Sequence, residues 1–403
     1  MDCYYDYFID DEENEKDIQQ FIDMTEGMKI LDLRGIREFK RLGEITSGQL
    51  NDVISLYKYG IKENPWDDIE REKLENNKIK DRIKGQDVAV EKSISIIKRA
   101  KTGFSGLQHS SASKPKGILF FAGPTGTGKT ELAKAIAELL FGDEGACRRF
   151  DMSEYSESHS AQKLFGAPPG YVGYESGGQL TNTIKEHPFS LLLFDEVEKA
   201  SPTIWDKFLQ ILEDGRMTDG QGNTVYFSEC LIVFTSNLGI YQDVGGVKKR
   251  VVDMNMSYNE LNKVVTKGIQ DYFFSKGKPE VLNRIGKNLI VFNFIQPEAA
   301  KEILFSQINK ICKAVYSMKK IRIEFRNDIV KEKLYQKVLT NLEEGGRGVG
   351  NIVEEYFTTP LSTYVFDNRI ENGQTIIIED ITGLNSDESE LEMPKIIASL
   401  ERN

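Results

Sequence analysis

The chain has 403 residues, enough for about two or three domains with well-buried cores. Its 52 Lys and Arg residues against 63 Asp and Glu residues leave a net charge of −11, which argues against a broad basic face for nucleic acid or a membrane surface. Its apolar runs are too short to span a bilayer, and its first residues do not resemble a signal peptide. The four cysteines lie far apart without metal-ligand spacing, which indicates unpaired thiols in a reducing compartment. We therefore expect a cytoplasmic protein that has neither a membrane nor a nucleic acid as its partner.

The first part of the chain, residues 1–65, begins with an acidic cluster and continues with apolar residues spaced three and four apart. This spacing predicts short amphipathic helices, and no residue pattern in the region indicates chemistry, so its role stays open. From residue 66 to about 101 the pattern is charged and helical, with Asp87 as the expected N-cap of a helix that includes Ile97. Residues 105–116 are rich in small and polar residues and predict a surface loop.

Between residues 117 and 292, apolar runs suited to strands alternate with helical segments. This alternation predicts an α/β fold with a parallel sheet and crossover helices, and we expect one large domain over residues 66–293. Residues 294–382 predict a smaller α+β domain that contains a short strand at 321–325 and a second strand at 375–378. Residues 383–403 are expected to form an acidic tail.

A glycine-rich segment follows the apolar run Ile118–Ala122. It matches the pattern GxxxxGK[ST] and consists of Gly123, Pro124, Thr125, Gly126, Thr127, Gly128, Lys129 and Thr130. Glycines let consecutive backbone N–H groups turn toward a phosphate, and a helix expected from Thr130 to Phe141 would point its positive end at the same group. We expect Lys129 to bind the β- and γ-phosphates and the Thr130 hydroxyl to bind Mg²⁺. The segment therefore predicts a nucleotide site.

Two carboxylates, Asp195 and Glu196, come directly after the apolar run Leu191–Phe194. Ligands of open α/β sheets bind at the carboxyl ends of the strands. We expect Asp195 to hold Mg²⁺ through its water shell and Glu196 to polarise the attacking water as a general base. Asn237 follows another apolar run, Leu231–Phe234, and is predicted to orient that water or to contact the γ-phosphate.

These motifs, taken in order, resemble the Clp-type AAA+ protein unfoldases and disaggregases, and in particular their second, C-terminal ATPase module. The resemblance covers residues 70–382, most of the chain. The matching segments are 82–87, 123–130, 151–155, 166–175, 194–200, 212–220, 235–239, 279–285 and 345–347. The resemblance implies an AAA+ P-loop NTPase large domain, a smaller α+β lid domain, and a homohexameric ring that uses ATP and Mg²⁺ and acts on a protein substrate.

The resemblance also assigns roles to individual residues. Arg82 and Ile83 match the segment that covers the adenine, and Asn237 matches sensor 1. Arg284 matches the arginine finger, which reaches the γ-phosphate held by the neighbouring subunit. Arg347 matches sensor 2, which the lid domain provides to the nucleotide of its own chain.

A separate segment carries the substrate hypothesis. Gly170, Tyr171, Val172 and Gly173 resemble the family's pore loop, whose aromatic residue grips the threaded polypeptide. Flanking glycines allow movement, and an aromatic residue beside a β-branched one can insert between side chains of any sequence. A second loop, at residues 216–223, is expected to line the same pore.

Several positions depart from the family pattern. Lys84 stands where isoleucine is usual, Val281 where an aromatic residue is usual, Gly286 where an acidic residue is usual, and Gly346 where alanine is usual. The segment 244–246 is the nearest match to the family's peptidase-docking tripeptide and is a poor one, which argues against delivery to a Clp peptidase. We therefore expect a divergent member with a single ATPase ring.

Two other functions compete with an unfoldase. The first is a regulatory or assembly switch, in which ATP orders a ring that docks a partner through residues 1–65 without threading a chain. The second is a nucleic-acid motor, because related AAA+ modules move DNA. The acidic charge balance and the aromatic pore loop argue against the motor.

Overall fold

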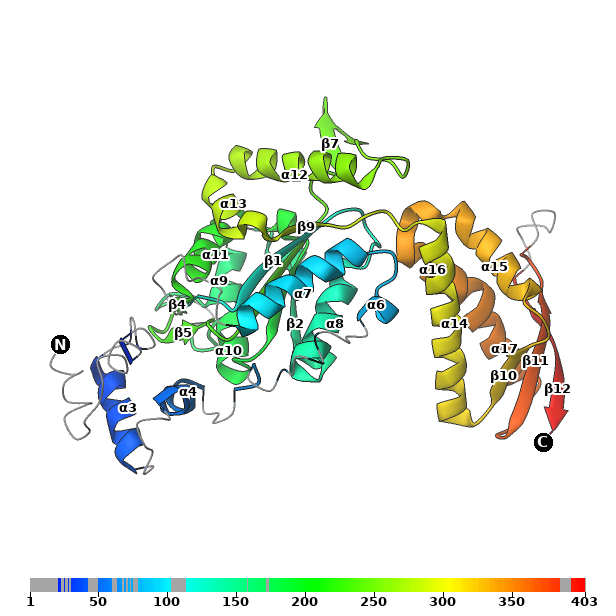
Figure 1. Cartoon of the computed structure of the whole chain (residues 1–403), viewed down its shortest axis with the longest axis horizontal. Helices are drawn as coiled ribbons and strands as arrows, with labels where there is room; N and C mark the ends of the chain where they lie inside the picture. The colour runs from blue at the N-terminus through cyan, green and yellow to red at the C-terminus, as the bar shows by residue number, and fades with distance from the viewer. Residues whose placement is uncertain are drawn as a thin grey trace.

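The structure is a computed structural model, shown in Figure 1. It describes residues 21–22, 25, 28, 30–42, 50–59, 64–66, 69, 72, 74, 79–102, 114–157, 159–171, 174–384 and 393–402. From left to right, Figure 1 shows helices α3 (Ile30–Leu42) and α4 (Leu50–Tyr59) near the N-terminus, a large α/β unit, and a small unit that ends at the C-terminus. We call the elements from α6 to β9 the large unit and those from α14 to β12 the small unit.

A five-stranded sheet forms the centre of the large unit. Its strands are β1 (Gly117–Ala122), β2 (Cys147–Asp151), β3 (Leu191–Asp195), β6 (Leu231–Ser236) and β9 (Leu289–Val291). Their order is β2-β3-β6-β1-β9, and every pair is parallel. The predicted parallel sheet and the three predicted central strands are confirmed. Residues Leu119 and Phe121 pack on one face of the sheet and Phe120 on the other, so both faces are covered and the strands are apolar throughout.

Helices cover the two faces of this sheet (Figure 1). They are α6 (Ile79–Arg82), α7 (Asp87–Lys101), α8 (Lys129–Phe141), α9 (Ser160–Phe165), α10 (Gln179–Glu186), α11 (Pro202–Asp214), α12 (Tyr258–Ser275) and α13 (Pro279–Ile285). Short 3₁₀ turns lie at η2 (Glu144–Ala146), η3 (Met152–Tyr155), η4 (Val197–Lys199) and η5 (Gly286–Asn288). The expected N-cap at Asp87 is wrong by one residue: Gln86 is the N-cap of α7, and its side chain bonds both backbone groups of Asn293 at 2.9 Å.

Two antiparallel hairpins project from the large unit. One joins β4 (Arg216–Thr218) to β5 (Thr224–Tyr226), and the other joins β7 (Tyr241–Val244) to β8 (Val247–Arg250). Gly245 and Gly246 both have positive φ, which suits the tight turn between β7 and β8. In Figure 1 this hairpin extends beyond α12 at the top of the molecule.

The small unit packs four α-helices and two shorter helical segments against a three-stranded sheet. Its elements are α14 (Pro297–Lys319), β10 (Arg322–Phe325), α15 (Ile329–Thr340), η6 (Leu342–Glu344), α16 (Gly345–Val353), the π-helical η7 (Glu354–Thr358), α17 (Thr359–Asp367), β11 (Gln374–Ile381) and β12 (Ile396–Arg402). Strand β11 lies between β10, which is parallel to it, and β12, which is antiparallel. The expected small α+β unit is confirmed.

The strand β12 corrects one expectation. Residues 383–403 were expected to form an acidic tail, but residues 396–402 pair with the whole length of β11. Ile396 is buried in the small unit's core, and Ala398 packs against that core. Burial of these apolar residues and the ladder of backbone hydrogen bonds outweigh the acidity of the preceding segment.

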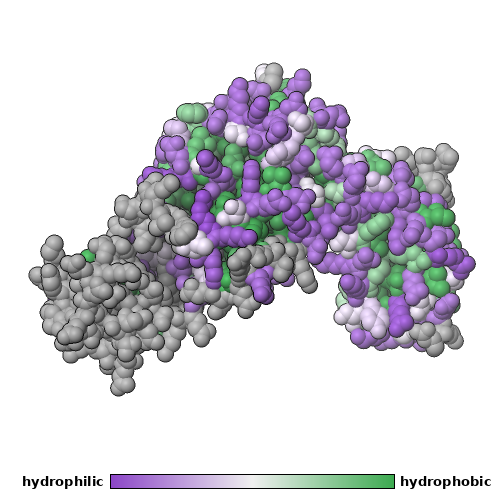
Figure 2. Space-filling model, in the orientation of Figure 1, coloured by the Kyte–Doolittle hydropathy of each residue, from purple (hydrophilic) through white to green (hydrophobic). Residues whose placement is uncertain are grey.

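Near the N-terminus, α3 (Ile30–Leu42) and α4 (Leu50–Tyr59) are the described helices of residues 1–65, where short helices were expected. Figure 2 shows hydrophilic residues spread over both units, with apolar patches between them. Within the described ranges, no helix is both long and apolar enough to cross a membrane.

Candidate nucleotide site

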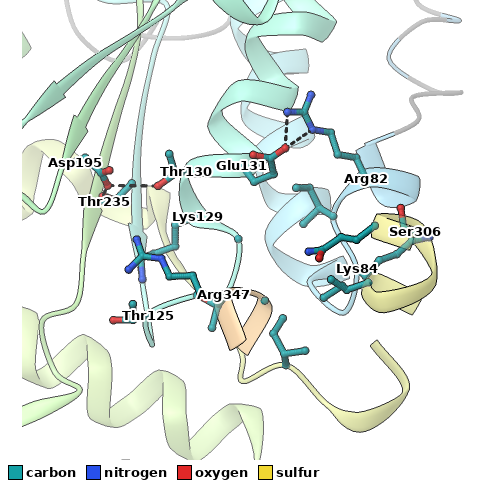
Figure 3. A pocket seen from close by; sticks show the side chains of 18 of the residues that line it. Arg82, Lys84, Thr125, Lys129, Thr130, Glu131, Asp195, Thr235, Ser306 and Arg347 are labelled. Carbon is teal, nitrogen blue, oxygen red and sulfur yellow. Dashed lines mark hydrogen bonds and ion pairs between the residues drawn. The ribbon is translucent and has the colours of Figure 1, made fainter. Parts of the chain in front are cut away.

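A cavity of about 1000 Å³ lies where the large and small units meet. The large unit contributes the phosphate loop (residues 123–130), α6, the start of α8, and residues at the carboxyl ends of β2, β3 and β6. The small unit contributes residues of α14 and α16. Figure 3 shows Lys129, Asp195 and Arg347 among the side chains that line it.

The phosphate loop has the backbone that its glycines permit. Gly123, Gly126 and Gly128 have φ values of 143°, 76° and 98°, a region that other residues rarely adopt. Helix α8 begins at Lys129, one residue before the predicted start at Thr130, and ends at Phe141 as predicted, with Gly142 following at φ 76°. Thr127 is buried and its hydroxyl donates to Pro124 O at 2.8 Å, which fixes the loop from inside.

The ammonium group of Lys129 joins the loop to the sheet. Its Nζ donates to Gly123 O at 2.7 Å, to Pro124 O at 2.8 Å and to Asn237 Oδ1 at 2.9 Å. Burial lowers the pKa of Lys129 to about 8, although the nearby carboxylates Glu198 and Asp195 oppose the shift. The sequence predicted Lys129 and Asn237 as separate members of the site, and the structure brings them into direct contact.

Asp195 ends β3 with its carboxylate almost completely buried. Its Oδ1 accepts hydrogen bonds from Thr235, on the neighbouring strand β6, and from Thr130 at 3.5 Å. Its Oδ2 accepts from Arg149 Nε, on the other neighbouring strand β2, at 2.9 Å. The two residues predicted to hold Mg²⁺, Thr130 and Asp195, therefore lie together.

Glu196 follows with an unusual backbone. Its φ of 56° and ψ of 50° place it in the left-handed region, which is rare for residues other than glycine and is often found at functional sites. Its N–H donates to Thr235 Oγ1 at 3.1 Å, and its carboxylate bonds Lys199 Nζ. One buried threonine thus holds both Asp195 and Glu196.

Three residues that help to build the site had no role predicted from the sequence. Thr235 fixes the acidic pair, Arg149 bonds Asp195, and Glu198 Oε1 accepts from Asn237 N at 3.0 Å. Glu198 and Thr235 lie inside matched segments, so their position in the motif was the available indication. Arg149 lies on β2 just before a matched segment, and only the sheet order places it beside Asp195.

Arg82, which matches the segment expected to cover the adenine, lines one end of the cavity. Its guanidinium pairs with Glu131, Glu138 and Glu144 at 2.5, 2.8 and 2.7 Å. Burial opposes the charge, but the bonds to Glu144 and Glu131 raise the pKa of Arg82 overall. Arg82 therefore lines the cavity while its charge holds α6 to α8. The apolar side chains on this side are Ile83 from the large unit and Ile295 and Ile303 from the small unit.

Arg347 enters the cavity on the small unit. The preceding residue, Gly346, donates its N–H to Gly126 O at 2.8 Å, so α16 rests directly on the phosphate loop. A Cβ on Gly126 would lie 2.2 Å from Glu344 O, so only glycine fits this approach. Arg347 is also close enough to oppose the charge on Lys129.

Two predicted residues lie elsewhere. Arg284, on α13, does not line this cavity, and its Nη2 bonds Glu213 on α11. Tyr171 is 62% exposed in a turn whose N–H bonds Pro168 O at 3.2 Å. Val172, the other predicted pore residue, lies outside the described residues.

The residues present fit a magnesium nucleotide. The cavity offers inward-turned backbone, a lysine, an arginine and a helix N-terminus for phosphates, which is the chemistry that anions require. Thr130 and Asp195 offer hard oxygen donors, and Mg²⁺ is commonly held by one or two carboxylates together with substrate phosphates and water. Across the ranges that the structure describes, no group of three His, Cys, Asp or Glu residues forms a metal cage of its own.

Comparisons with known proteins agree with this fold and site. Residues 114–288 match the family described as AAA domain (Cdc48 subfamily). The chain is 37% identical over 304 residues to the chaperone protein ClpB of Bdellovibrio bacteriovorus, covering 75% of this chain and 33% of that protein. It is 33% identical over 362 residues to the mitochondrial chaperone protein ClpB4 of Arabidopsis thaliana, covering 88% of this chain and 36% of that protein.

A parallel sheet with a phosphate loop and an acidic pair at its carboxyl edge defines an AAA+ nucleoside triphosphatase. This chain belongs to that family, as a member homologous to the ClpB chaperones. It spans about a third of the length of the curated relatives it matches. Membership of the family implies ATP binding and hydrolysis.

Proposed function

We propose that the chain is an ATP-dependent protein unfoldase or remodelling chaperone, which assembles into a homohexameric ring and threads polypeptide through the pore. One observation carries the proposal: the cavity gathers Lys129, Glu196 and Asn237, whereas Arg284, on α13, lies outside it and bonds Glu213. The partly exposed position of Arg284 supports its use by a second copy of the chain.

In this proposal, the chain's own groups bind and orient the reactants. ATP supplies the phosphoanhydride bond, and Mg²⁺ supplies charge neutralisation at the phosphates. Lys129 and Arg347 bind phosphate oxygens, and Thr130 and Asp195 hold the metal. Glu196 accepts the proton of the attacking water, which requires its carboxylate to part from Lys199. Asn237, whose backbone N–H donates to Glu198, orients the same water or contacts the γ-phosphate.

The threading part of the proposal rests on the turn that carries Tyr171. The side chain is largely exposed, and Gly170 has a φ of 87°, a conformation that glycine adopts without steric cost. The turn is not isolated, because Gln221 Nε2 donates to both Tyr174 O and Glu175 O at 3.1 Å. Gln221 lies in the β4–β5 hairpin, so the two loops expected at the pore contact each other.

The shared active site can be tested by mixing two inactive variants. Lys129→Met should bind nucleotide too weakly to turn it over but keep Arg284, whereas Arg284→Ala should bind nucleotide but lack the charge it lends, with a loss of about 10³-fold or more in turnover. Mixed in equal amounts, they should regain ATPase activity at sites where one copy binds and the other lends its arginine. A mixture as inactive as its components, or an Arg284→Ala variant with wild-type turnover, contradicts the shared site.

Two substitutions test hydrolysis and threading separately. Glu196→Gln should lower turnover by about 10²-fold or more while nucleotide still binds, so that the substrate stays trapped and can be identified by pull-down.

Tyr171→Ala should keep ATPase activity and lose the unfolding of a tagged, folded substrate. Unfolding at the wild-type rate by Tyr171→Ala rules out threading by this residue.

The same assays separate the competing functions. A regulatory switch should hydrolyse ATP slowly, without stimulation by an unfolded protein such as casein. A nucleic-acid motor should be stimulated by DNA at low salt. Stimulation by casein and not by DNA is the result that the unfoldase proposal requires.

A further inference from the structure

Arg149 lines the nucleotide cavity, and the mechanism above gives it no part. It lies on β2, whose parallel register with β3 places its neighbour Asp151 opposite Asp195. Its Nε and Nη2 lie 2.9 and 2.8 Å from Asp195 Oδ2. The same Nη2 lies 3.4 Å from Asp151 Oδ2. One guanidinium therefore bridges the carboxylate proposed to hold the metal and a second carboxylate at the end of its own strand.

The two oxygens of Asp195 have different partners. Oδ1 faces Thr130 and Thr235, and Thr235 is 1% exposed and also holds the N–H of Glu196. Moving Thr235 would disturb both acidic residues, so Oδ1 is committed. Among the described residues, Oδ2 faces Arg149 alone. Oδ2 is therefore the oxygen that a metal-bound water can take, and Arg149 already occupies it.

Exposure decides which partner of this ion pair can leave. The side chain of Arg149 is 51% exposed and that of Asp195 only 10%. A guanidinium at the surface moves into water or to another partner at little cost, whereas a buried carboxylate left alone is costly. Asp151 is positioned to be the other partner of Arg149, because its Oδ1 accepts hydrogen bonds from Ser153 N at 3.0 Å and Ser153 Oγ at 2.5 Å. These bonds fix its Oδ2 toward Arg149.

We propose that Arg149 is an internal counter-cation, which occupies Oδ2 of Asp195 until Mg²⁺ displaces it toward Asp151. The proposal rests on the proposed role of Asp195 in holding Mg²⁺. Arg149 and the metal compete because two positive charges a few ångströms apart repel each other. Arg149 is thus a positioning residue that sets how much Mg²⁺ the site requires, and Asp151 sets how readily Arg149 gives way.

The proposal predicts opposite changes in the Mg²⁺ requirement when Arg149 is replaced and when its second partner, Asp151, is replaced. Arg149→Met removes the competitor, so the free Mg²⁺ needed for half-maximal binding should fall about two- to fivefold, the range for a partly exposed ion pair. Asp151→Asn removes the alternative partner and keeps an oxygen for Ser153, so the Mg²⁺ requirement should rise about twofold. In the double variant, Asp151→Asn should have no further effect, because the guanidinium it receives is gone.

The experiment uses the full chain and a fluorescent ADP analogue, with free Mg²⁺ titrated from an EDTA-treated start, so the readout is binding rather than turnover. Thermal unfolding of each variant checks its fold, and Arg149→Lys, which keeps the charge, should remain near the wild type. An unchanged or higher Mg²⁺ requirement in Arg149→Met overturns the inference, and an unchanged requirement with weaker analogue binding at saturating Mg²⁺ would make Arg149 a phosphate ligand. If wild-type binding does not depend on Mg²⁺ at all, the metal role of Asp195 is wrong, and the inference is wrong with it.

Discussion

Lys129 keeps its charge at a place where burial lowers its pKa to about 8. Only the protonated ammonium attracts phosphate, so nucleotide affinity should be lost as the pH rises through this value. At pH 9 about one molecule in ten is protonated before binding, so the Kd for a fluorescent ADP analogue should be about tenfold higher than at pH 7. Lys129→Met should bind weakly at both values and lack this slope. An equal slope in both proteins would place the titration on another group.

At the scale of single residues, the sequence predicted the site residues whose positions follow from the spacing of the motifs. Asp195 ends an apolar strand, Asn237 follows one directly, and Lys129 follows another after the loop 123–128, so the parallel sheet was sufficient to bring them to one edge. Arg149 was not predicted, since its contact with Asp195 depends on which strand lies next to which. The role of Arg82 was incomplete for a similar reason: Glu131 and Glu138 stand two helical turns apart on one face of α8, and only the packing of α6 brings Arg82 to them.

At the scale of elements, Asp219 organises the hairpin between β4 and β5. Its carboxylate is fully buried and accepts from Lys185 at 2.6 Å, from Gln221 N at 3.0 Å and from Asn223 N at 2.8 Å. Burial alone would raise the pKa of Asp219, but the bonds from Lys185 and Asn223 lower it overall. Because the folded pKa is lowered, this stabilisation is present above the unfolded pKa of Asp and lost as the pH falls through the folded value.

Asp219→Ala should destabilise the chain by about 2–3 kcal/mol, because Lys185 and the backbone N–H groups of Gln221 and Asn223 all lose the same buried acceptor. Asp253→Ala is the matched control: Asp253 accepts from Asn255 N at 2.7 Å in an exposed turn, where water replaces the lost bond. It should cost about 1 kcal/mol or less. Urea unfolding followed by circular dichroism measures both, and equal losses would show that burial of Asp219 does not matter.

Elements were predictable where the pattern was long and periodic. The central strands and α8 have such patterns, whereas β12 follows an acidic stretch, and its fit depends on its partner β11. The β7–β8 hairpin was also not predicted, although Gly245 and Gly246 between two strand-forming valines are a hairpin pattern. From the sequence, the segment 244–246 was interpreted only as a poor match to the family's peptidase-docking tripeptide.

At the scale of the whole molecule, the cavity exists only while the two units are docked. Besides the contact of Gly346 with Gly126, Arg250 on β8 pairs with Glu343 at 2.7 Å and lies over the ring of Phe294 at 5.1 Å. Glu343 and Gly346 both lie within a few residues of Arg347. Docking of α16 on the phosphate loop should therefore decide whether Arg347 reaches the nucleotide.

Two glycines on α16 allow this dependence to be tested. A Cβ on Gly346 would lie 3.2 Å from Gly126 O, a backbone atom, whereas one on Gly350 would meet only the flexible end of Gln307 at 4.0 Å. Valine is a better helix former than glycine, so a loss of binding in one of the two variants reports docking and not helix propensity.

Gly346→Val should push α16 from the phosphate loop and weaken binding of the ADP analogue by about tenfold, the loss expected for one charge-assisted contact. Gly350→Val should bind nearly as the wild type does. Adding Arg347→Ala to Gly346→Val should cost little more, because the arginine is already displaced, whereas Arg347→Ala alone should cost about as much as Gly346→Val. If Gly346→Val binds the analogue normally, or if the two losses add in full, contact between the units does not position Arg347, and the small unit would affect the nucleotide by another route.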